Sequence, residues 1–285
     1  MARQVTVNLF DVTSGARTPR LSDTIEAFEA LQLDQRWRGD IRLDGVEWRN
    51  TDGARAAFLD FAKKREIGPG KLTDRRAIES IHMQRDENFG EETAALYVPS
   101  KKWLLVLNNQ SGVGPNRMMG YFNAIDPGNV QHDYEANPKL DATAMSQLRR
   151  MEGVSSVEVT ATLDALSASQ REVGTALARA ARPSGAQRIS FALMANERYK
   201  KGRFLDTGMM KEFMRHLRSE GPGVTTLRVT GPDPDSEKDL VVDLIRHRLK
   251  RRYNENELDV DSRRFTIESR WRLLARAFRS WNNTL

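Results

Sequence analysis

Cysteine is absent from the 285-residue chain, and histidine is scarce. The lack of cysteine excludes disulfide bonds, thiolate catalysis and any zinc or iron–sulfur site with cysteine ligands. The four histidines are His82, His132, His216 and His247, and no two of them have the spacing of a metal-binding pair. A catalytic serine–histidine pair is not excluded, but no residue pattern indicates one. We therefore expect no catalytic residues, no metal site and no cofactor.

Long apolar runs are also missing. No stretch approaches the roughly 18 consecutive apolar residues that a membrane-spanning helix requires. The first residues, MARQVTVNLFDV, enter an alternating strand pattern directly and contain no apolar core of a signal peptide. With 39% hydrophobic and 29% charged residues, the composition is that of a globular protein rather than a disordered one. These observations predict a cytoplasmic protein.

A glycine-rich turn, GVGP, raises the question of a phosphate-binding loop. A dinucleotide-binding fingerprint would need glycine where Arg117 stands. The nearest candidate for a Walker loop, GPGKL, has Leu72 in place of the magnesium-binding hydroxyl. Pro115 also lacks the backbone N–H that an anion-binding loop would supply. We interpret the stretch as a corner in which Gly112 and Gly114 adopt positive φ and Pro115 begins a helix.

The periodicity of apolar residues predicts an α+β fold. Alternation predicts strands at 4–10, 93–98, 102–109, 155–164, 187–196 and 224–231. Helical spacing predicts helices at 21–33, 115–125, 169–181, 207–219 and 265–281, the last of them amphipathic. Two segments are ambiguous: we expect a strand at 55–65, with a helix as the alternative, and a helix at 237–252, with a strand through Val242 as the alternative. The result would be mixed or antiparallel sheets with flanking helices.

The chain is long enough for two domains. We expect an N-terminal α+β domain at residues 1–150. A C-terminal basic α+β domain at 151–285 would bind DNA, form a dimer, or both. Residues 1–150 contain 21 Lys+Arg and 21 Asp+Glu, whereas residues 151–285 contain 24 and 18, so the net charge of +6 lies in the second half.

Two basic stretches carry most of this excess charge. The run RHRLKRR at 246–252 has five Lys or Arg residues and no acid, and six arginines accompany a single acid from Arg263 to the end. A basic balance localised in this way is expected of a protein with a polyphosphate partner. Solvated helix faces are the alternative explanation.

The order of several segments resembles the family of RexA, the exclusion protein of phage lambda. The likeness begins at AALYVPSKKWLLVLNNQSGVGPNRMMGYF, where two strands lead to a Gly-Pro corner and an apolar helix. It continues through VEVTATLDAL, then ISFALMANERYKKGR with its basic loop, and TTLRVTG with its Leu-Arg pair. It covers roughly residues 93–285.

This resemblance implies a homodimeric protein of temperate phages that binds double-stranded DNA without sequence preference. It implies a two-domain fold similar to that of the recombination-associated ring protein RdgC. It also implies a role in phage exclusion and in the choice between lysis and lysogeny, with a membrane-protein partner encoded nearby. Neither enzymatic activity nor a small-molecule substrate is expected.

The candidate site residues follow from position and charge. Lys200, Lys201 and Arg203 match the family's basic loop, and Arg228 matches its Leu-Arg strand. Charge alone adds Arg246, Arg248, Lys250, Arg251, Arg252, Arg263 and Arg264 as DNA-binding candidates. If six to eight C-terminal cations contact phosphates, affinity should fall by roughly three to four decades between 50 and 200 mM salt. Trp271, Phe278 and Trp281 lie along one face of the C-terminal helix, where they would form either core or a dimer interface.

Two other functions remain open. A metal-dependent nuclease of a bacterial anti-phage defence system would use acidic residues near the basic strands. An interaction module would instead bring its basic face to an acidic protein or to a membrane surface. Liposome co-sedimentation and a pull-down without nucleic acid would separate the interaction module from the DNA-binding protein, for which both signals should be lost after nuclease treatment.

Overall fold

The computed structural model describes residues 4–65, 68, 71–73, 76–79, 81, 84, 87–109, 111–125, 132–163, 179, 181–195, 204–205, 224–235, 239–261 and 264–285. Contacts divide the chain into two compact units. The first unit comprises residues 1–7, 12–135 and 251–285, and the second comprises residues 8–11 and 136–250. This division differs from the predicted boundary at residue 150, because the C-terminal segment returns to the first unit and packs on its sheet.

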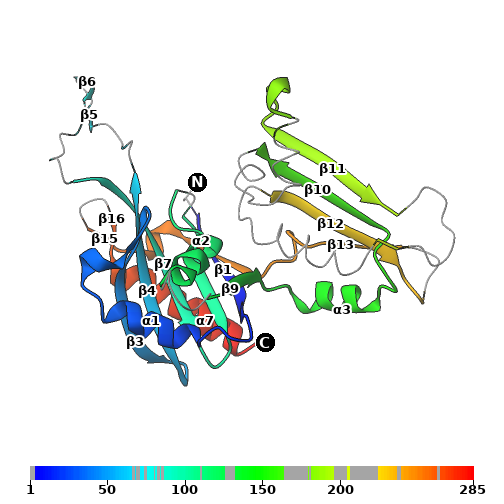
Figure 1. Cartoon of the computed structure of the whole chain (residues 1–285), viewed down its shortest axis with the longest axis horizontal. Coiled ribbons are helices and arrows are strands. Elements are labelled where there is room, and N and C mark those ends of the chain that lie inside the picture. Colours follow the sequence, from blue (N-terminus) through cyan, green and yellow to red (C-terminus); the bar gives the residue numbers. More distant parts are fainter. Residues whose placement is uncertain are drawn as a thin grey trace. The chain divides into compact units, whose positions relative to one another are not determined.

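An eight-stranded sheet forms the core of the first unit (Figure 1). Its strand order is β14-β1-β8-β7-β4-β3-β2, and β9 also pairs with β1. The bounds are β1 Gln4–Ser14, β2 Trp37–Arg38, β3 Ile41–Thr51, β4 Ala54–Arg65, β7 Phe89–Val98, β8 Trp103–Leu107, β9 Tyr134–Pro138 and β14 Lys250–Asn254. The described residues of this unit form three α-helices: α1 Leu21–Glu29, α2 Pro115–Asn123 and α7 Ile267–Asn282. Two short ribbons, β5 Lys71–Thr73 with β6 Arg76–Glu79 and β15 Val260–Asp261 with β16 Arg264–Phe265, complete it, together with the short helices η1 Leu33–Arg36 and η4 Glu255–Glu257.

The central strand β4 is buried on both faces. Successive side chains of a strand point to opposite faces, so Phe58 packs against Trp271 of α7 and Phe61 packs against Tyr121 of α2, each pair with ring centroids 5.6 Å apart. Figure 1 accordingly shows α1 and α2 on one side of the sheet and α7 on the other. Burial on both sides explains why the segment AAFLDFA shows no alternation. The strand predicted at 55–65 is confirmed.

Helix α7 buries the aromatic face that the sequence predicts. Trp271, Phe278 and Trp281 are 5%, 0% and 3% exposed, and the Phe278 ring lies 6.3 Å from that of Trp103 on β8. These rings therefore belong to the core of a single chain. The expected dimer interface through them is wrong, because side chains already buried within their own unit offer no area to a second copy.

The corner before α2 forms for a different reason from the predicted one. Pro115 begins the helix as expected, but Gly114 caps it at φ −77°, and neither Gly112 nor Gly114 has positive φ. A Cβ at position 112 would overlap the hydroxyl of Thr93. That hydroxyl accepts a hydrogen bond of 2.8 Å from the N–H of Val113. Gly112 is thus required by close packing rather than by backbone conformation.

A four-stranded antiparallel sheet forms the core of the second unit, with strand order β11-β10-β12-β13. The bounds are β10 Ser156–Thr162, β11 Arg188–Met194, β12 Val224–Pro232 and β13 Asp239–Asp243, and the unit also contains α3 Ala142–Arg150 and the short helix η2 Arg182–Ser184. One face of the sheet is apolar and buried, with Val157, Leu227, Val229 and Val242 all 0% exposed. Both units combine helices with antiparallel strands, so the predicted α+β class is confirmed.

The helix predicted at 237–252 is wrong. The segment forms β13, a turn and β14, in agreement with the alternative of a strand through Val242. The i, i+4 spacing of its apolar residues also fits alternation, because Val242 and Leu244 are buried while Val241 is 56% exposed. The β-branched pair Val241–Val242 favours the strand, and pairing with β12 fixes it.

The other strands predicted in the described part of the chain are confirmed as β1, β7, β8, β10, β11 and β12. The helices predicted at 169–181 and 207–219 fall on residues that the structure describes only at Arg179 and Ala181. None of the described helices is long and apolar enough to cross a membrane.

The packing at position 112 gives a stability prediction. Gly112→Ala should displace the Thr93 hydroxyl and break its hydrogen bond to the Val113 N–H, lowering the free energy of unfolding by about 1–3 kcal/mol. Denaturant titration followed by circular dichroism measures this loss. Gly114→Ala is the matched control, because a Cβ there meets nothing within 4 Å, and it should change stability by less than about 1 kcal/mol. Equal losses in the two variants would contradict the packing explanation.

Candidate nucleic-acid interface

The predicted DNA-binding residues that the structure describes lie on three strands and one turn. Arg228 is on β12, Arg264 is on β16, and the remaining ones follow one another in the turn after β13 and along β14: Arg246, Arg248, Lys250, Arg251 and Arg252. Lys200, Lys201, Arg203 and Arg263 lie outside the described residues. Whether these cations face solvent or a carboxylate decides which of them can contact phosphate.

Strand β14 presents cations at a sheet edge. It is the terminal strand of the eight-stranded sheet, and its Lys250 and Arg252 side chains are exposed. No carboxylate in the described part of the chain forms an ion pair with either of them. Arg251 faces the other way, with its guanidinium 5.8 Å from the ring centroid of Trp281. Alternation along the strand thus places two unpaired charges about 6.6 Å apart on one exposed face.

The turn between β13 and β14 is held by two aspartates. Asp243 accepts hydrogen bonds from the backbone N–H groups of Ile245 and Arg246, at 3.1 and 3.2 Å. Asp141 caps α3 and lies 2.8 Å from Nδ1 of His247. Burial by itself would raise the pKa of Asp141, but the hydrogen bonds from Ala144 and His247 keep that pKa below its ordinary value. Arg246 is exposed on this turn, and none of the acids that the structure describes pairs with its side chain.

Arg228 is half-exposed but has acidic neighbours. Its guanidinium lies 3.6 Å from Glu158 and 3.8 Å from Asp243, one on each adjacent strand. These distances allow weak ion pairing at a solvated surface. A phosphate at Arg228 would have to compete with both carboxylates, so the residue contributes little net positive potential.

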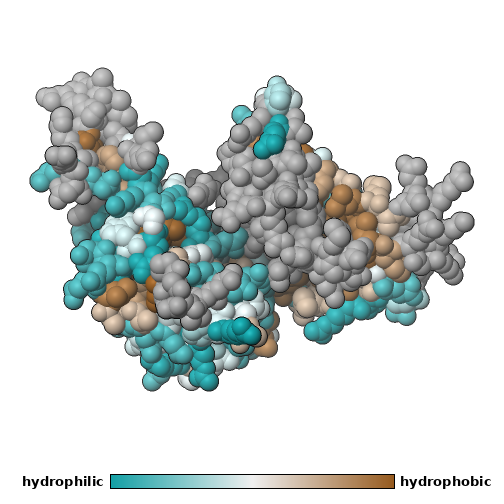
Figure 2. Space-filling model, in the orientation of Figure 1, coloured by the Kyte–Doolittle hydropathy of each residue, from teal (hydrophilic) through white to brown (hydrophobic). Residues whose placement is uncertain are grey.

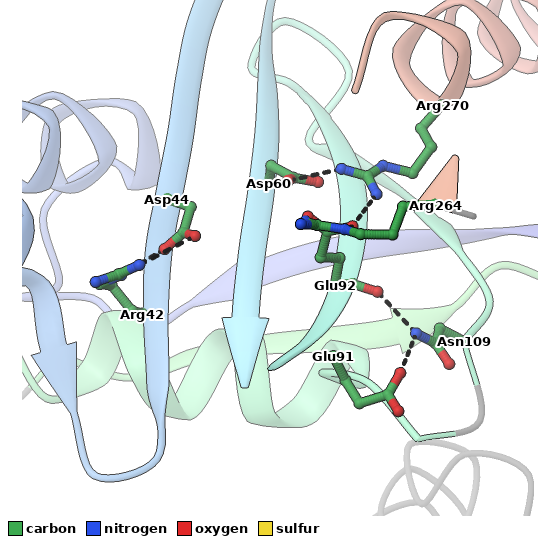
Figure 3. A network of polar contacts seen from close by, with 8 residues as sticks. All are labelled: Arg42, Asp44, Asp60, Glu91, Glu92, Asn109, Arg264 and Arg270. Carbon is green, nitrogen blue, oxygen red and sulfur yellow. Dashed lines mark hydrogen bonds and ion pairs between the residues drawn. The ribbon is translucent and has the colours of Figure 1, made fainter. Parts of the chain in front are cut away.

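Arg264 belongs to a polar network inside the first unit (Figure 3). It forms an ion pair with Glu92 of β7, and Glu92 also accepts a 2.6 Å hydrogen bond from Arg270 of α7. Arg270 is buried and donates a second hydrogen bond, of 2.8 Å, to Asp60 of β4. Arg264 is therefore neutralised by a carboxylate of its own unit, and we leave it out of the candidate interface.

The same network shifts the pKa values of two carboxyl groups in opposite directions. Burial raises the pKa of Asp60 to about 7, even though Arg270 lies beside it. Burial also acts on Glu92, but hydrogen bonds from Arg264 and Arg270 outweigh it and hold the pKa of Glu92 below the ordinary value. The difference arises because Glu92 is bonded by two guanidinium groups, whereas Oδ1 of the more deeply buried Asp60 has no hydrogen-bond partner within the described ranges.

Two further arginines of α7 are paired as well. Arg272 lies 2.5 Å from Asp259, and Arg276 forms an ion pair with Glu257. The basic composition after residue 263 thus reflects contacts within the first unit more than an electropositive surface. The acidic partners of the C-terminal arginines were not predicted from the sequence, although Asp60, a carboxyl group within the apolar run AAFLDFA, is a visible sign of a buried polar contact.

The described residues do not form a cluster that could bind the metal ion of a nuclease. Within them, no three or more His, Cys, Asp or Glu residues are grouped so that they could hold a metal ion. In the network of Figure 3, Arg270 lies between the carboxyl groups of Asp60 and Glu92 and bonds to both.

The protein is thus of the α+β class: it has two compact units built on antiparallel sheets, and one of these sheets ends in a basic edge strand. A family model matches residues 3–270, and the chain belongs to that family, which is described as a family of unknown function (DUF6731). No curated protein matches the chain.

The pKa of Asp60 predicts a pH dependence of stability. The folded state binds this proton more tightly than the unfolded state, so the protonated carboxyl stabilises the fold, and this contribution is lost as pH rises. The free energy of unfolding of the wild type relative to Asp60→Asn should therefore fall between about pH 4 and pH 7 and be constant above, with a total change of at most about 4 kcal/mol. Denaturant titrations across this range measure it.

Glu92→Gln provides the control of opposite sign. Because the pKa of Glu92 is lowered, its stabilising contribution is present above the ordinary pKa and is lost as pH falls. The stability of the wild type relative to this variant should rise with pH. If the difference in unfolding free energy between the wild type and each variant does not change with pH, burial and ion pairing do not shift the pKa values of Asp60 and Glu92 as described.

Proposed function

We propose that the protein binds double-stranded DNA through the phosphate backbone, without reading the base sequence. The observation that carries this proposal is the pair of exposed, unpaired cations Lys250 and Arg252 on the edge strand β14. Arg246, exposed on the preceding turn, supports it. Non-specific binding derives its free energy from counterions released when Lys and Arg neutralise phosphates, and it needs no base-reading element.

The biological part of the proposal rests on the resemblance to the RexA family. The protein would act in the cytoplasm of a bacterial host as a homodimer with an RdgC-like fold. Its function would be phage exclusion and control of the choice between lysis and lysogeny, together with a membrane protein encoded nearby. It would have no enzymatic activity and use no cofactor. The metal-dependent nuclease is the alternative.

The ion pairs near the C-terminus reduce the expected salt dependence. Three phosphate contacts, by Arg246, Lys250 and Arg252, correspond to a slope of about −2.7 in log affinity against log salt. Affinity should then fall about 40-fold between 50 and 200 mM salt. A slope much steeper than this would indicate further contacts from cations outside the described residues.

A charge-reversed pair of variants tests the interface. Lys250→Glu with Arg252→Glu should weaken binding at least tenfold at 50 mM salt, equally for unrelated duplexes, and should reduce the salt slope by about two. Fluorescence anisotropy with labelled duplexes measures both quantities.

The matched control is Arg272→Glu with Arg276→Glu. It changes the net charge by the same amount at two arginines that already have carboxylate partners, and it should leave the affinity within about threefold of wild type. Equal losses in both double variants would mean that net charge alone governs binding. No binding of the wild type at 50 mM salt would refute the proposal.

The biological role and the alternative have separate tests. Expression of the wild type in a bacterial host should lower the plating efficiency of an infecting phage, and the β14 double variant should restore it. Plasmid DNA incubated with the protein and Mg²⁺ or Mn²⁺ should stay intact. Nicking at stoichiometric protein would replace the proposal with the nuclease.

A further inference from the structure

Strand β11 forms one edge of the four-stranded sheet of the second unit (Figure 1). Its sequence, RISFALM, has no proline, no glycine and one charge, at Arg188. A sheet edge leaves backbone N–H and C=O groups without partners, and a long uncharged edge is a template for another strand.

The hydrogen-bond pattern shows which residues face outward. Leu163 donates to Gln187 and Ala195 donates to Ser155, at 3.1 and 2.8 Å. Since hydrogen-bonded pairs alternate in an antiparallel ladder, the odd-numbered residues of β11 bond to β10. The even-numbered ones direct their N–H and C=O groups to the open edge: Arg188, Ser190, Ala192 and Met194. Within the described ranges, no backbone group bonds to these outward groups.

The hydrophobic core also stops before this edge. Ile189, Phe191 and Leu193 pack against the core of the second unit but remain half-buried, whereas Val157 and Val159 on the neighbouring β10 are fully buried. On the face drawn in Figure 2, tan and brown residues are visible where Figure 1 places this sheet. A further strand beside β11 would bury the rest of these side chains.

The other end strands in the order of the two large sheets are protected. Strand β13 carries aspartate at both ends, β14 begins with three successive cations, and β2 has only two residues. Charges and short length are how natural sheets keep their edges from pairing. Strand β11 has neither protection, so its edge is open to pairing with another strand.

The sequence of β11 is complementary to itself. In antiparallel pairing about Phe191, Ile189 faces Leu193 on the core side and Ser190 faces Ala192 on the other side. Arg188 faces Met194, so no charge meets a like charge, whereas parallel pairing in register would place Arg188 beside Arg188. All outward N–H and C=O groups find partners, and the half-buried apolar residues of both copies meet.

We propose that a second copy of this chain pairs with β11 antiparallel across a two-fold axis, which makes one continuous sheet through both second units. The interface is isologous, as expected of a closed dimer. This inference rests on the homodimer contained in the proposed function. It replaces the interface expected on the C-terminal helix, and its test is independent of DNA.

The first test exploits the contact between Arg188 and Met194. Met194 is 65% exposed, so its replacement leaves the fold intact. Met194→Arg puts like charges opposite each other twice per dimer, and Met194→Glu puts opposite charges there. The dissociation constants of the two variants should differ by about tenfold at low salt, with the Glu variant tighter, and should converge at high salt. Sedimentation equilibrium of the nuclease-treated full chain measures both.

The second test removes one outward N–H. Ala192→Pro should raise the dimer dissociation constant at least tenfold, because proline lacks the donor and its ring meets the incoming strand. Val241→Pro is the matched control: it removes an outward N–H from the opposite edge of the same sheet and should leave the dimer intact. Circular dichroism verifies that each variant is folded.

Three results would overturn the pairing. They are a monomeric wild type at tens of micromolar, identical dissociation constants for the two Met194 variants, and a dimer that Val241→Pro disrupts as strongly as Ala192→Pro does. A monomer that binds duplex DNA would refute this inference alone. A dimer of the predicted behaviour that binds no DNA would refute the DNA-binding proposal alone.

Discussion

The first unit depends on one buried contact, between the carboxyl group of Asp60 in the middle of a strand covered on both faces and the guanidinium group of Arg270 on the last helix. Taking the guanidinium charge out of water costs several kcal/mol, which is offset only when its geometry and further hydrogen bonds are favourable. Arg270 meets that condition by also bonding Glu92, which Arg264 holds from the other side. One guanidinium group therefore fixes α7 in a single register against β4 and β7. Sliding the helix along the sheet would leave a buried carboxyl without its partner.

This constraint separates two groups of cations that look alike in the sequence. The arginines after residue 263 serve largely to neutralise carboxylates within their own unit, whereas Lys250 and Arg252 stand on an edge strand without such partners. Net charge is a property of the whole chain and does not distinguish them. Only the positions of the acids, contributed by distant segments such as β4 and β7, show which charges remain to attract a polyanion.

Most strands could be predicted from the sequence because their side chains alternate between core and solvent, as in β1, β10 and β12. The segment 237–252 was harder, since Leu240, Leu244 and Ile245 fit both a helix and two strands, and only pairing with β12 decides between them. The role of Gly112 could not be predicted, because the Thr93 hydroxyl that excludes a side chain there lies on another strand. The pairing of Arg264 and Arg270 was hidden in the same way. Local patterns determine elements, while partners remote in sequence determine what each side chain does.

The return of the C-terminal segment to the first unit has a consequence for the order in which the molecule assembles. Strand β14 and helix α7 follow the second unit in the sequence, so an emerging chain lacks one edge and one covering layer of the large sheet until residues 250–282 have been made. During that time one apolar face of β4, with its carboxyl, stays in water. Burial by this helix raises the pKa of Asp60, so proton uptake by its carboxyl group would mark the docking of α7 onto the sheet.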